Sequence, residues 1–137
     1  MSAEFGRRAL CALGASAILF AATEAFAGSY LNRANLLIRQ GMKETEYLRQ
    51  RVNDRELASV VHQLARARLE AAGKMTVPKE VVQAHPHVLL VLENCERAAQ
   101  CAEDGDPERF LVYHQRALDE ERTLRAVLKQ LGWSLPD

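Results

Sequence analysis

Apolar residues recur every three or four positions along most of this 137-residue chain, and this spacing restricts its fold more than any other feature. A first stripe of this kind comprises Leu31, Ala34, Ile38, Met42, Thr45, Leu48 and Val52. Because an α-helix turns once in about 3.6 residues, such a stripe forms one face of a helix. The seven Gly and four Pro are also few for the many turns of a β-sandwich. The sequence therefore predicts an all-α fold.

Three further stripes follow, at about residues 55–72, 86–103 and 107–131. The first of them comprises Leu57, Val61, Leu64, Arg68 and Ala72, widened by Val60, Ala65 and Leu69. The second comprises Val88, Val91, Leu92, Cys95, Ala98, Ala99 and Ala102. The third comprises Phe110, Tyr113, Ala117, Leu124, Val127, Leu128 and Leu131. We expect each stripe to face a common core.

Residues typical of helix ends separate the stripes. Asp54 and Asp106 stand where a side chain can cap the helix that follows. Gly73 and Gly105 suit helix C-termini. Pro86 favours a helix start over a helix interior, because proline lacks the N–H that an interior position needs. The four helices are therefore expected to be joined by short connections.

The second and fourth stripes resemble each other at an offset of 52 residues. At this offset Asp54 corresponds to Asp106, and His62-Gln63 corresponds to His114-Gln115. The simplest interpretation is a duplicated helical hairpin, with hairpins at residues 30–73 and 80–131. Each hairpin buries little by itself, so we expect the two to pack as an antiparallel four-helix bundle. The alternative is a chance likeness between amphipathic helices.

The first 27 residues differ from the rest of the chain. Arg7 and Arg8 precede an uncharged, mostly apolar run at residues 10–22, and Ala25-Phe26-Ala27 fits a small-x-small cleavage site. This order is typical of a secretory signal peptide. We expect residues 1–27 to be removed and residues 28–137 to form a periplasmic or secreted domain. The alternative is an uncleaved inner-membrane anchor at residues 9–27. The Arg pair also resembles the twin-arginine export signal.

The charge balance and the missing motifs narrow the function. Lys+Arg and Asp+Glu both number 18, which argues against a nucleic-acid partner. The chain has no glycine-rich phosphate loop and no Ser or Cys in a nucleophile motif. We therefore expect no enzymatic activity, and contact with a membrane only through the N-terminal segment if it stays uncleaved.

The four histidines are the natural candidates for metal or cofactor ligands. His85 and His87 flank Pro86, and His62 and His114 lie near the edges of their stripes. The Glu-x-x-His pairs of bundle di-metal sites are absent. The sequence therefore predicts no cofactor. The alternative is a metal or noncovalent haem carrier that uses His62 and His114 with Met42.

Two Arg–His pairs have the spacing of a known catalytic motif. Four residues separate Arg109 from His114, and six separate Arg55 from His62. This pattern is similar to that of the HEPN-type helical ribonucleases, in which such a pair would act on the scissile phosphate. The resemblance implies a ribonuclease as a further alternative.

Two cysteines, Cys95 and Cys101, follow the predicted leader. On one helix their Cα atoms would be about 9 Å apart, whereas a disulfide needs less than about 7 Å. We expect Cys95 in the core and Cys101 outside as a free thiol. The alternatives are a local disulfide, if the helix ends before Cys101, or an interchain disulfide through Cys101.

The residues together favour a non-enzymatic binding or interaction module. Large apolar residues that lie off the predicted inner faces are the candidates for partner contact: Leu36, Tyr47, Leu90 and Trp133. We expect a protein partner, or self-association, in the cell envelope.

Overall fold

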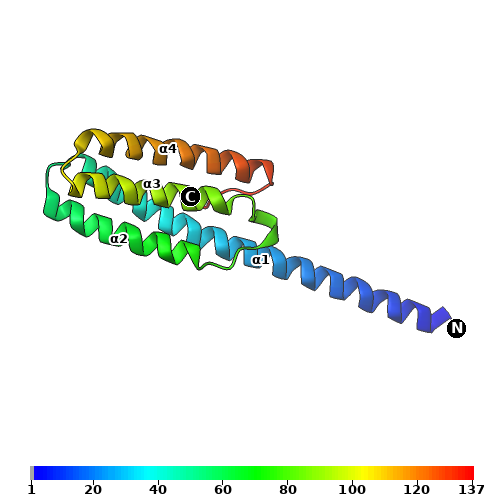
Figure 1. Ribbon diagram of the computed structural model, residues 1–137. Helices are drawn as coiled ribbons and strands as arrows, with labels where there is room; N and C mark the ends of the chain where they lie inside the picture. Colours follow the sequence, from blue (N-terminus) through cyan, green and yellow to red (C-terminus); the bar gives the residue numbers. More distant parts are fainter. Residues whose placement is uncertain (1) are drawn as a thin grey trace.

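The computed structural model describes residues 2–137, and side chains from Thr23 onward. It contains helices α1 (Ser2–Arg49), α2 (Arg55–Gly73), α3 (His85–Glu103) and α4 (Pro107–Gln130), with a short 3₁₀ helix, η1 (Lys79–Val81), before α3. Residues 2–137 contain no strand. The helices lie side by side, and the N-terminal part of α1 extends beyond the others (Figure 1). The all-α prediction is confirmed.

The predicted caps begin the second and fourth helices. The Asp54 side chain accepts a hydrogen bond from the Leu57 backbone N–H at 3.0 Å, and Asp106 accepts one from the Arg109 N–H at 3.1 Å. Such bonds satisfy backbone donors that the first turn of a helix leaves free. Gly105 adopts a left-handed φ of +78°, which ends α3 as expected.

The other two predicted boundaries differ in their outcome. Pro86 occupies the first turn of α3, where its missing N–H costs nothing, so the helix starts where the sequence indicates. Gly73 is the last residue of α2, but it does not adopt the left-handed conformation of a C-terminal glycine, and Lys74 caps the helix instead.

Helix α3 is the centre of the packing. It makes its most extensive contacts with α2 and α4, and α1 lies against all three. All seven residues predicted to face inward from α3 are at most 2% exposed: Val88, Val91, Leu92, Cys95, Ala98, Ala99 and Ala102. The small alanines among them let neighbouring helices approach closely, since the interaxial distance depends on the side chains at the contact.

Helix α2 is rotated relative to the prediction. Leu64 and Val60 were expected to face inward, but they are 44% and 55% exposed. The buried face of α2 is formed by Ala58, Val61, His62, Ala65 and Ala72. Because the apolar stripe of α2 is wider than the face its neighbours cover, one edge of the stripe stays in solvent.

Most of the predicted leader, residues 1–22, lies outside the residues whose side chains are described. Helix α1 runs without a break through the predicted cleavage position after Ala27, which is itself buried. Among residues 23–137, no helix is both long and apolar enough to cross a bilayer.

Candidate functional site

His62 joins α2 to α3 through both of its ring nitrogens. Nδ1 lies 2.6 Å from Glu103 Oε2, and Nε2 lies 2.7 Å from Glu96 Oε1. Carboxylates only accept hydrogen bonds, so both nitrogens donate when the ring is the imidazolium. The His62 side chain is 9% exposed and that of Glu96 is 16% exposed. The bond from His62 to Glu96 therefore links two helices in a largely dry setting, where charge-assisted bonds are strong, whereas Glu103 is 36% exposed.

His114 takes the corresponding place in α4 but points to α1. Its Nε2 lies 3.3 Å from Glu46 Oε2, and its ring stacks on Phe110 with centroids 5.8 Å apart. Its Nδ1 is buried and has no hydrogen-bond partner within the described part of the chain. Burial lowers the pKa of His114 below its ordinary value, and the nearby Glu46 only partly opposes this.

The two histidines around Pro86 diverge. His85 Nδ1 is 2.7 Å from the Tyr30 hydroxyl of α1, whereas His87 Nδ1 is 2.5 Å from Glu120 Oε1 of α4. Burial lowers the pKa of His85 and raises the pKa of Tyr30 to about 12. All four histidines thus connect different helices.

The structure does not bring the predicted metal and haem candidates to one place. His62, His114 and Met42 have different neighbours, and Met42 Sδ lies 3.6 Å from Cys95 Sγ. The two carboxylates at His62 bond to different ring nitrogens, so they cannot share one ion with it. Over the part of the chain whose side chains are described, no three His, Cys, Asp or Glu side chains form a metal-binding group.

The Arg–His pairs do not form a phosphate-cleaving arrangement. Arg109 lines a surface pocket between helices, whereas His114 is buried against Phe110 and Glu46. Arg55 donates from Nε to the Glu103 carbonyl oxygen at 2.8 Å, while both nitrogens of His62 contact carboxylates. Both nitrogens of His62 are thus occupied, and the one nitrogen of His114 without a partner, Nδ1, is buried.

Both cysteines with described side chains are free and buried. The expectation that Cys101 faces outward is wrong, because this residue is only 7% exposed. It packs with Leu48 and Phe110, since the short connection after α3 brings the start of α4 against it. Burial raises the pKa of Cys95 to about 11 and also raises that of Cys101. A buried, protonated thiol is poorly placed for an interchain disulfide.

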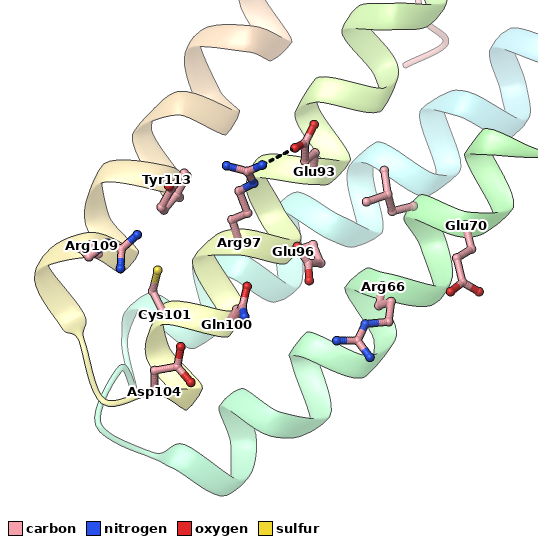
Figure 2. Close-up of a pocket in the computed structure, with 11 residues that line it drawn as sticks. Arg66, Glu70, Glu93, Glu96, Arg97, Gln100, Cys101, Asp104, Arg109 and Tyr113 are labelled. Carbon is pink, nitrogen blue, oxygen red and sulfur yellow. Dashed lines mark hydrogen bonds and ion pairs between the residues drawn. The ribbon is translucent and has the colours of Figure 1, made fainter.

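A shallow pocket of about 590 Å³ opens over α3, between α2 and α4. Figure 2 shows Arg66 and Glu70 on the α2 side and Arg109 and Tyr113 on the α4 side. The pocket is lined by Arg66, Leu69, Glu70, Glu93, Glu96, Arg97, Gln100, Cys101, Asp104, Arg109 and Tyr113. Both charge signs are present, and the arginines of α3 and α4 lie together at one end.

The predicted partner-contact residues divide into two groups. Leu36, Tyr47 and Leu90 are exposed, as their positions off the inner faces indicate. Trp133 is not: it is half-buried and packs against the core, because the chain after α4 folds back onto the bundle. The backbone N–H of Trp133 donates a hydrogen bond to the Leu128 carbonyl oxygen at 2.9 Å, which holds this turn in place.

An apolar row on α2 was missed as a surface feature. The row, here named the α2 stripe, consists of Leu57, Val60, Leu64, Ala67 and Ala71. All but the half-buried Leu57 are exposed. The signal for it was present in the sequence, because the apolar residues of α2 cover more than one helix face.

No protein-family model, no curated protein and no solved structure matches this chain.

Proposed function

We propose that this chain is an exported, non-enzymatic interaction module that binds a helix of a partner protein along the α2 stripe. In this proposal two antiparallel hairpins form the bundle, and the leader at residues 1–27 directs the domain to the periplasm. The observation that carries the proposal is the α2 stripe itself.

The spacing within the α2 stripe is that of a helix–helix seam. Its members follow one another at steps of three, four, three and four residues. This is the a/d pattern with which one helix packs against another in a coiled coil. Val60 and Leu64 in its centre are about half exposed. A row of this kind offers apolar area that a second helix would remove from water.

The corresponding positions of α4 provide an internal comparison. At the offset of 52 residues the stripe maps onto Arg109, Val112, Arg116, Asp119 and Thr123. Four of these five positions of α4 are polar, and α4 still packs in the bundle. Apolar residues at these positions are therefore not needed for a helix to pack in this bundle. The apolar character of the α2 stripe supports a role outside the packing of this domain.

The charges beside the stripe favour a partner over a second copy. Glu56, Gln63 and Glu70 follow one edge of the stripe at steps of seven residues. In an antiparallel pair of α2 helices, Glu56 of one copy would approach Glu70 of the other, and like charges repel. Arg68, near the other edge, already pairs with Glu44 of α1. We therefore infer an amphipathic partner helix with Lys or Arg beside its apolar row.

A synthetic peptide tests the proposed binding mode on the full chain. The probe is an amphipathic helix with Leu at its a and d positions and Lys beside them, and its control carries Glu in place of Lys. We expect saturable binding of the Lys peptide in fluorescence anisotropy and weaker binding of the Glu peptide. Leu64→Gln should weaken binding about tenfold, because a half-exposed Leu contributes about 1.4 kcal/mol of burial.

The matched control is Leu111→Gln, which removes a similarly exposed leucine from α4. It should leave binding unchanged. Equal loss in both variants, or no loss in Leu64→Gln, would overturn the proposal. Sedimentation velocity of the unliganded chain provides the second test: a dimer that Leu64→Gln dissociates would show that a second copy occupies the stripe.

The export part of the proposal has its own measurement. Intact-mass analysis of the protein recovered from the periplasm should give a chain that begins at Gly28. A chain that still carries residues 1–27 in the membrane fraction would support the anchor interpretation instead.

A further inference from the structure

We infer that the α4 end of the surface pocket is a binding site for a phosphate-type oxyanion, held by Arg97 and Arg109 beside Tyr113. This inference is independent of the α2 stripe, because it concerns α3 and α4.

Three guanidinium groups lie near the Tyr113 side chain, and two of them, those of Arg97 and Arg109, line the pocket. The Arg116 Cζ atom lies 5.1 Å from the Tyr113 ring centroid, and the Arg97 Cζ atom lies 5.9 Å from it. Arg97 and Arg109 extend from neighbouring helices towards the space beside Tyr113 (Figure 2). The neighbouring Arg97 and Arg109 guanidinium groups also lower the pKa of Tyr113. The arginines thus form one cluster.

The cluster carries more positive charge than nearby carboxylates balance. Glu93 pairs with Arg97 at 2.8 Å, so one of the three charges is offset. Among residues with described side chains, neither Arg109 nor Arg116 takes part in an ion pair. Asp106 caps α4 by accepting a hydrogen bond from the Arg109 backbone N–H, and its charge also acts on the Arg109 guanidinium group.

The remaining acidic residues of the pocket lie elsewhere. Glu96 and Glu70 are on the α2 side of α3, away from Arg109 and Tyr113, and Asp104 lies near the end of α3 (Figure 2). Glu96 is bonded to His62 at 2.7 Å. Cys101, which also lines the pocket, stays a neutral thiol near pH 7 because burial raises its pKa. A dianion near Tyr113 would therefore meet mainly positive charge.

The geometry of the donors selects the class of ligand. Guanidinium groups present flat pairs of N–H donors that match the oxygens of phosphate and carboxylate. Here the donors come from two helices and from a phenol, so they approach an anion from different directions. A tetrahedral dianion has oxygens for all of them, whereas a planar carboxylate occupies one such pair. We therefore expect phosphate to bind more tightly than acetate.

The test is a titration of the full chain with inorganic phosphate, followed by the ionisation of Tyr113. Bound phosphate offsets the arginine charges that lower the Tyr113 pKa, so this pKa should rise on binding. The phenolate absorbs near 295 nm, so a pH titration at this wavelength measures tyrosine ionisation. Subtracting the curve of Tyr113→Phe from that of the wild-type chain gives the pKa of Tyr113. A parallel titration with glycerol phosphate distinguishes the free ion from phosphate carried by an organic molecule; binding of either supports the site.

Variants decide whether binding is local. Arg109→Gln should weaken phosphate binding about tenfold, as expected for the loss of one charge-assisted contact. Arg122→Gln removes the same charge from an exposed position of α4 where Arg122 pairs with Asp119, and it should leave binding unchanged. No saturable binding at millimolar phosphate, equal binding of acetate, or equal loss in both variants would overturn the inference. Leu64→Gln should keep phosphate binding, which separates this site from the α2 stripe.

Discussion

The link between His62 and Glu96 gives the sharpest prediction about stability. The bond joins α2 to α3 at 2.7 Å, and both side chains are mostly removed from water. His62→Ala would leave the carboxylates of Glu96 and Glu103 without this partner. We expect the free energy of unfolding to fall by about 2–4 kcal/mol, because a broken buried pair leaves an uncompensated charge.

A double-mutant cycle isolates the energy of the bond itself. His62→Ala, Glu96→Ala and the double variant are unfolded in urea at constant pH, with helix content followed by circular dichroism. A hydrogen bond to a charged group contributes about 1.5–3 kcal/mol, so we expect a coupling energy in that range.

An exposed ion pair on α4 serves as the control for this cycle. Arg122 and Asp119 lie 3.2 Å apart, but their side chains are 75% and 58% exposed. Solvent screens such a pair, so its coupling should be about 0.2–0.5 kcal/mol. A His62–Glu96 coupling no larger than that of the control would refute the reasoning that burial makes this bridge strong.

Three further predictions concern protonation, thiol reactivity and backbone strain. Burial lowers the pKa of His85 and His114 below 6.5, so these residues bind protons more readily in the unfolded chain than in the folded one. The free energy of unfolding should therefore be highest above pH 6.5 and fall as the pH drops below it. Urea midpoints at several pH values check this, and His114→Gln should flatten the dependence, whereas greater stability at acidic pH would contradict it. Cys95 should react with a thiol reagent in urea but slowly in the native chain, because burial raises its pKa to about 11; rapid native labelling would show that the core opens there. Gly105→Ala should lower the free energy of unfolding by about 1–2 kcal/mol, because Gly105 has a φ of +78°. The control is Gly73→Ala, which should be neutral or stabilising, because Gly73 has no positive φ and open space around it. Equal effects of the two substitutions on thermal unfolding would argue against strain at Gly105.

The helices and much of their core could be predicted from the amino-acid sequence. The capping bonds of Asp54 and Asp106, the left-handed Gly105 and the position of Pro86 act within a few residues, so they can be recognised without a partner segment. The inward face of α3 was also predictable. Because α2, α4 and α1 pack around this helix, its whole apolar stripe is covered.

Which edge of a wide stripe is buried, and what the polar side chains contact, depends on how the helices pack together. Periodicity is a property of one helix, whereas burial depends on where the neighbouring helices lie. For this reason the sequence did not predict that Leu64 is exposed, that Cys101 is buried or that Trp133 packs against the core. The bridge from His62 to Glu96 joins residues 34 positions apart, so its geometry follows from the packing of α2 on α3 and from no local pattern.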